Sequence, residues 1–121
     1  MAIHKYTVLE ANNINLGQSG SIFTDAADSA IKPPEGKAFV AIQFLAATTF
    51  DSSGGLVAEN STFYPSTEAS AHDATAGSET YQEGSGGKQI DVSNTFPAGT
   101  TIYGRWTEID LTTGSIIAYI G

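Results

Sequence analysis

The sequence predicts an all-β fold, an antiparallel β-sandwich or barrel of the jelly-roll type. Short runs of β-branched and aromatic residues alternate along the chain with clusters of Gly, Asn, Asp and Pro, which favour turns. Of the 121 residues 40% are hydrophobic and only 15% are charged, so that Ser, Thr and Gly fill the polar outer faces. A chain of this size buries roughly two thirds of its unfolded surface in one core. We therefore expect a single β domain spanning residues 1–121.

The strongest strand candidate covers residues 38–46. Strict alternation places Phe39 on one face and Phe44 on the other, and both faces are apolar. This pattern is typical of a central strand that is covered on both sides. Residues 56–59, reached through the turn at 51–55, are expected to be its hairpin partner.

Weaker strand signals lie on either side of this segment. Near the N-terminus, residues 5–9 and 21–24 are short strand candidates, and residues 89–92 form a third. The last third of the chain predicts a long strand over 100–111 that turns back into 115–121. We expect these two strands to form a hairpin that supplies a second apolar layer.

The segment 61–88 has a different composition. Its apolar residues are few and stand among Ser, Thr, Glu and Gly, so it predicts a long irregular segment. A short helix capped by Ser66 is the alternative for its first part. Long loops in small domains are often functional, and we expect either a projecting arm or a partner contact here.

Charge and cysteine content exclude several classes of protein. The net charge is −8, from 5 basic and 13 acidic residues, so the chain lacks the basic surface on which nucleic acids and anionic membranes depend. Without cysteine there is no disulfide framework and no thiolate metal site. No apolar run is long enough for a signal-peptide core or a membrane span, so we expect synthesis in the cytosol.

The residues that could carry chemistry do not form a recognisable constellation. His4 and His72 are the only imidazoles and stand far apart in the sequence. Ser85 lacks the spacing of a hydrolase nucleophile elbow. Glu108 and Asp110 share a predicted strand face, but a solvated face explains them better than the paired carboxylates of a glycosidase. We expect no enzyme activity, no cofactor and no metal site.

Three segments carry a resemblance to a known group of proteins. Residues 34–45, 96–107 (Phe-Pro-Ala-Gly-Thr-Thr-Ile-Tyr-Gly-Arg-Trp-Thr) and 114–121 resemble small structural proteins of tailed bacteriophages, particularly those of marine bacteria and cyanobacteria. The resemblance covers about half of the chain and leaves out 61–88. It implies a β-rich virion protein made in the host cytoplasm, either a capsid decoration or cement protein or a piece of the tail or fibre, and we expect the decoration protein on the head surface. Its partners would be the major capsid protein or other virion subunits.

Apolar side chains that a small sheet cannot hide predict a contact surface between subunits. They fall in an N-terminal stripe and on one face of the predicted C-terminal hairpin. The candidate interface residues are Ile3, Tyr6, Val8, Tyr103, Ile109, Ile117 and Tyr119. Burial against a second copy is the simple solution, and the resemblance implies a trimer.

A second function remains open at this stage. The chain could be a tail-fibre or receptor-recognition module that binds glycans through loops around Trp106, Tyr64 and Tyr81. Trp106 beside Arg105 would then form a platform on which a sugar stacks. The competing interpretation places this aromatic residue, like most within strands, in the core.

Overall fold

The computed structural model describes residues 6–9, 17–60, 63–67 and 90–121. All of its named elements are strands, and both of its sheets are antiparallel, which confirms the predicted all-β fold. The strands are β1 (Ser21–Thr24), β2 (Phe39–Phe44), β3 (Thr49–Phe50), β4 (Leu56–Ala58), β5 (Thr101–Ile109), β6 (Leu111–Thr113) and β7 (Ile116–Ile120). No helix within the described ranges is long and apolar enough to span a membrane.

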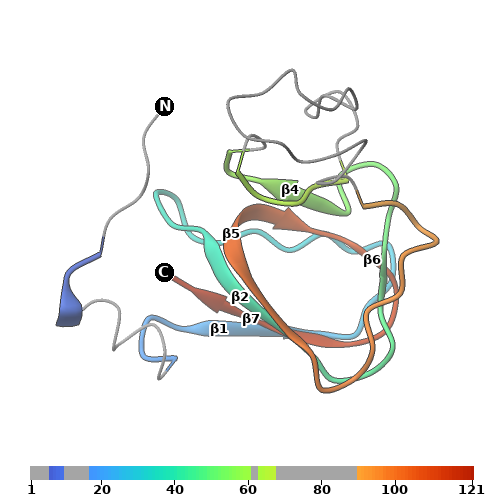
Figure 1. Ribbon diagram of the computed structural model, residues 1–121, viewed down its shortest axis with the longest axis horizontal. Helices are drawn as coiled ribbons and strands as arrows, with labels where there is room; N and C mark the ends of the chain where they lie inside the picture. The colour runs from blue at the N-terminus through green and yellow to red at the C-terminus, as the bar shows by residue number, and fades with distance from the viewer. Residues whose placement is uncertain (1–5, 10–16, 61–62, 68–89) are drawn as a thin grey trace.

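Five of the strands form one sheet with the order β1-β7-β2-β5-β4, and β3 pairs with β6 in a separate two-stranded sheet. Figure 1 shows β2 in the middle of the larger sheet, between β7 and the long, bent β5. The central position predicted for this strand is therefore confirmed. Because β2 is paired along both edges, all of its residues except Gln43 are buried.

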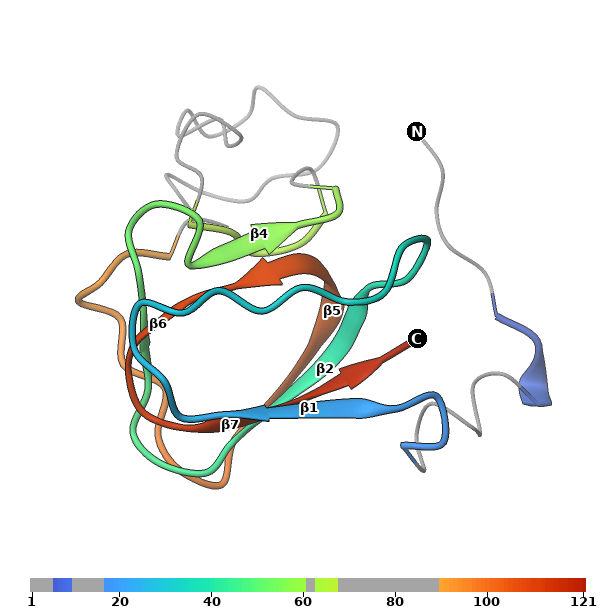
Figure 2. The same cartoon turned by 180° about the vertical axis from the view of Figure 1, so that it is seen from behind.

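Both predicted hairpins are wrong. β5 and β7 do not pair with each other, because β2 lies between them, so they share one sheet rather than forming a second layer. Between them the chain leaves the sheet as β6 to pair with β3 (Figure 2). Likewise β4 pairs with β5, not with β2. Each predicted hairpin is therefore replaced by pairing between strands that lie far apart in the sequence.

The turn from β6 into β7 depends on Gly114. Its φ of +102° lies in a region that side-chain-bearing residues rarely adopt. A Cβ at this position would lie 2.7 Å from the carbonyl oxygen of Ala47, which is backbone and cannot move aside. Glycine therefore permits the turn to lie close to the backbone of Ala47. After this turn β7 pairs with the edge of β2 that β5 does not occupy.

The core has a bulge that the alternating pattern did not predict. The register between β2 and its neighbours shifts between Phe39 and Ala41. Phe39 therefore faces the core together with Ile42 and Phe44, instead of lying on the opposite face. A bulge inserts one unpaired residue and reverses the alternation from that point on.

Three phenylalanines join the two sheets. The rings of Phe44 and Phe96 stack with centroids 4.8 Å apart, and Phe50 of β3 meets both rings edge-on at 6.0 and 5.4 Å. Phe96 begins the predicted turn 96–99, where Gly99 has a φ of +86°. Backbone hydrogen bonds between Phe96 and Thr48 hold this turn against the start of β3.

The weaker strand candidates have mixed outcomes. The strand at 21–24 is confirmed as β1. The described part of 5–9 is no strand, since Val8 and Leu9 have helical backbone conformation, and Figures 1 and 2 show this segment outside the sheet. Residues 90–92 are no strand either, although Ile90 enters the core.

Of the irregular segment predicted at 61–88, the structure describes residues 63–67. Residues 63–67 contain no named strand, and Ser66 is buried, with its carbonyl oxygen accepting a hydrogen bond from the Ile90 backbone. The rest of that segment, including the helix considered after Ser66, lies outside the described residues.

Candidate functional site

The solvent-facing side of the larger sheet is the candidate site. Strand pairing places residues in rows across β1, β7, β2 and β5, and directly paired residues share a face. One row, with Ile42 and Ala118 at its centre, faces the core. The two rows on either side of it face outward and are named the outer face here. Its residues are Ser21, Tyr119, Ala41 and Tyr103 in one row and Phe23, Ile117, Gln43 and Thr101 in the other.

The outer face is mainly apolar, and none of its eight residues carries a charge, although the protein has a net charge of −8. Tyr103 is 74% exposed and Phe23 is 58% exposed. Ile117 and Tyr119 lie half-buried between them, and the Tyr119 hydroxyl is 3.3 Å from Gln43 Oε1. Three of the predicted interface residues therefore do lie together on one exposed face: Tyr103, Ile117 and Tyr119.

Ile109 does not belong to this face. It is fully buried in the core, opposite Leu56, so its predicted place in an exposed apolar edge is wrong. The register between β4 and β5 shifts where Val57 and Ala58 pair with Glu108 and Trp106. This bulge reverses the alternation along β5, which turns Ile109 inward although Tyr103 on the same strand points outward.

The described N-terminal residues 6–9 are the second part of the candidate site. Val8 is 80% exposed and Leu9 is 70% exposed. Tyr6 is 36% exposed and contacts the sheet. Ile3, the third member of the predicted N-terminal stripe, lies outside the described residues.

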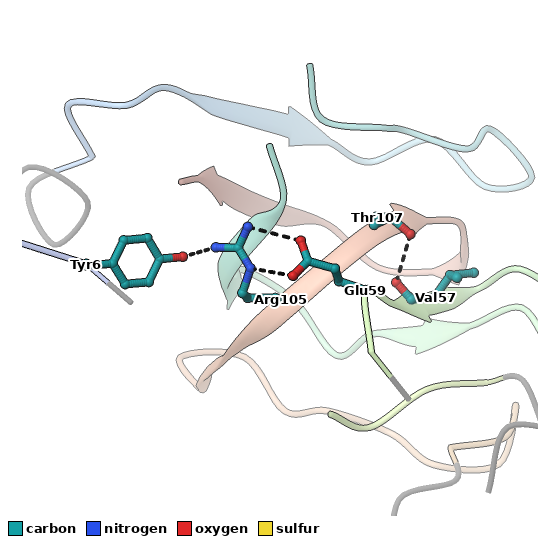
Figure 3. A network of polar contacts seen from close by, with 5 residues as sticks. All are labelled: Tyr6, Val57, Glu59, Arg105 and Thr107. Atoms are coloured by element: carbon teal, nitrogen blue, oxygen red, sulfur yellow. Dashed lines mark hydrogen bonds and ion pairs between the residues drawn. The ribbon is translucent and has the colours of Figure 1, made fainter. Parts of the chain in front are cut away.

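A buried polar network anchors this segment to the sheet (Figure 3). The Arg105 side chain is only 4% exposed and donates hydrogen bonds from Nε and Nη2 to the two carboxylate oxygens of Glu59, at 2.9 and 3.0 Å. Its Nη1 donates to the Tyr6 hydroxyl. Burial lowers the pKa of the Arg105 guanidinium, but the group remains charged and Glu59 compensates its charge.

Sequence analysis missed this network. Glu59 lies on the chain directly after β4, and its backbone N–H donates to the Arg105 carbonyl oxygen at 2.9 Å. The pairing of β4 with β5 therefore brings together two residues 46 positions apart. No local pattern signals that contact, because it depends on the strand order.

Trp106 does not form a sugar-binding platform. It is fully buried, and its Nε1 donates a 2.8 Å hydrogen bond to the carbonyl oxygen of Pro65. The core interpretation is therefore correct, and the glycan platform is a wrong prediction. Tyr64 is half-buried, and Tyr81 lies outside the described residues.

An acidic cluster lies where β5 passes into β6. Burial raises the pKa of the Asp110 carboxyl, and the negative charges of Asp51, Asp28 and Glu108 raise it further, against a smaller opposite effect of a hydrogen bond from Ser29. The Oδ1 atom of Asp110 is buried and has no hydrogen-bond partner within the described structure. Glu108 forms an ion pair with the exposed Lys32, at 4.0 Å. Ionised Asp110 is therefore an unfavourable group in the folded protein.

We expect Asp110→Asn to raise the melting temperature at neutral pH. A carboxyl whose pKa is raised by folding stabilises the protein only while it is protonated, and this contribution is lost as the pH rises through the folded-state pKa. The gain from the amide should therefore shrink as the pH falls from neutral toward about 3. Thermal unfolding followed across this range tests the prediction, and a gain independent of pH would contradict it.

Within the ranges that the structure describes, no group of three His, Asp or Glu side chains could hold a metal ion. His4, His72 and Ser85 lie outside the described residues, so their predicted roles as ordinary surface or linker residues stay predictions.

The chain was compared with protein-family models, with curated proteins and with solved structures. None of the three comparisons finds a match.

Proposed function

We propose that the protein is a structural subunit of a tailed-bacteriophage particle, a capsid decoration protein that adheres to other subunits of the head through its outer face. The observation that carries the proposal is the absence of charge from an exposed apolar face on a strongly acidic chain. Apolar exposed patches of this kind mark contact surfaces between proteins. The acidic remainder of the surface would face solvent and keep particles apart by repulsion.

Adhesion alone is a sufficient mechanism for such a protein. A subunit that binds only the assembled shell stabilises that state by mass action, and it needs no reaction chemistry. A specific contact between proteins buries roughly 800 Å² on each partner. The partners would be the major capsid protein or other virion subunits.

The proposal is tested by the composition and heat resistance of particles. We expect mass spectrometry of separately purified heads and tails to find the protein in heads at a fixed ratio to the capsid subunit. Particles that lack it should release DNA at a lower temperature than complete particles. Its presence in tail fractions alone would reject the decoration role and favour a fibre component.

Two variants test whether incorporation into heads depends on the outer face. Tyr103→Ser and Phe23→Ser together should reduce the amount of protein on heads. Val92→Ser is the matched control, since Val92 is 49% exposed but lies in the turn after Ile90, away from the outer face. Equal loss in both variants would contradict a role for this face.

A further inference from the structure

We infer that one occupant of the outer face is a second copy of this chain, whose N-terminal segment docks on it. The inference rests on the proposed function, because it takes the outer face to be a contact surface between subunits. It adds the identity of the partner and the part of the partner that makes the contact. The segment Tyr6–Leu9 is named the arm.

The first observation is that the chain has two exposed apolar surfaces that do not bury each other. Val8 and Leu9 of the arm are 80% and 70% exposed, and Tyr103 and Phe23 of the outer face are 74% and 58% exposed. If the arm folded over its own sheet, both sets would be covered. Each surface is therefore free to bind the complementary surface of another copy, at a gain of roughly 25 cal/mol per Å² of apolar area buried.

The second observation is where the arm leaves the molecule. The Tyr6 hydroxyl accepts a hydrogen bond from Arg105, which lies two residues beyond Tyr103 on β5. Arg105 is itself fixed by two hydrogen bonds to Glu59. The base of the arm is thus held beside the outer face, while the two aliphatic side chains that follow it remain exposed.

The third observation is charge. The arm Tyr6–Leu9 and the eight residues of the outer face carry no charged side chain, whereas the whole chain carries 5 basic and 13 acidic residues. Two acidic bodies repel each other over a Debye length of about 8 Å. A contact made through an uncharged arm and an uncharged face keeps the acidic side chains of the two copies out of the interface.

A contact between two different surfaces of the same chain has a characteristic consequence. The arm of each copy fills the face of the next, so the copies close into a reciprocal pair or a ring. If the outer face instead paired with the outer face of another copy, association would not require the arm. Mixing experiments separate these two arrangements.

The experiment uses two variants of the full chain. The arm variant carries Val8→Ser and Leu9→Ser, and the face variant carries Phe23→Ser and Tyr103→Ser. We expect the wild-type chain to associate at tens of micromolar in light scattering, and each variant alone to be a monomer. Because the face variant keeps its arm and the arm variant keeps its face, an equimolar mixture should form a complex of one copy of each.

The controls make each outcome informative. Val92→Ser should associate like the wild type, and unchanged dichroism spectra show that the variants fold. Three results would overturn the inference: a wild-type chain that stays monomeric, an arm variant that still associates, or a mixture without a mixed complex. Loss of association in the arm variant with normal incorporation into heads would leave the proposed function standing, whereas association of the wild-type chain without incorporation would reject that function but not the docking of copies.

Discussion

Phe44→Ala is expected to lower the free energy of unfolding by about 3–5 kcal/mol, the usual cost of removing a buried aromatic side chain. Phe44 is 1% exposed in the centre of β2, and its ring contacts both Phe50 and Phe96. Alanine leaves a cavity at the place where the two sheets meet. The loss should therefore separate the β3–β6 ribbon from the larger sheet as well as weaken the core.

Urea unfolding followed by tryptophan fluorescence measures this effect, because Trp106 is fully buried in the same core. Phe23→Ala is the matched control, since it removes the same ring from an exposed position on β1. Its cost should be at most about 1 kcal/mol, the range of strand propensities. Similar losses in the two variants would show that Phe44 does not occupy the core of the stable fold.

The class of fold could be predicted because it depends on local signals. Strand formers, turn residues and low charge are properties of short windows, and they correctly placed β1, the central strand and the strand over 101–109. The turn at 96–99 likewise follows from Pro97 and Gly99 alone.

Strand pairing could not be predicted because it depends on which distant segments compete for the same edge. Residues 100–111 and 115–121 look like a hairpin in sequence, but each of them pairs with one edge of β2. β5 and β7 therefore lie on either side of β2 in one sheet, instead of pairing with each other. Local turn residues carry no information about that competition.

The residues of the candidate site were predicted in part, and the misplacement of Ile109 has a local cause. Alternation correctly placed Tyr103, Ile117 and Tyr119 on a common face. It failed for Ile109 because a bulge in β5 reverses the inward and outward positions. A single sequence does not mark a bulge when no glycine or proline stands at the shift.

Glu59→Gln is expected to destabilise the protein by about 2–3 kcal/mol, the second largest effect we expect from a single change. The substitution keeps the size of the side chain but removes the charge that compensates Arg105, whose side chain is 4% exposed. An uncompensated buried charge can cost about 3–5 kcal/mol. The loss should be smaller here because the Glu59 side chain is 37% exposed, so water can reach the guanidinium when the carboxylate is gone.

A second substitution tests whether the loss of stability comes from the uncompensated charge of Arg105 or from a general packing defect. In the double variant Glu59→Gln with Arg105→Met, no buried charge remains, and the melting temperature should recover most of the difference from wild type. Tyr6→Phe removes only the hydroxyl that accepts from Arg105 and should cost about 1 kcal/mol. If the double variant is less stable than Glu59→Gln alone, the contribution of Arg105 is packing along β5 rather than a compensated charge, and the ion pair is not what holds β4 and the arm to the sheet.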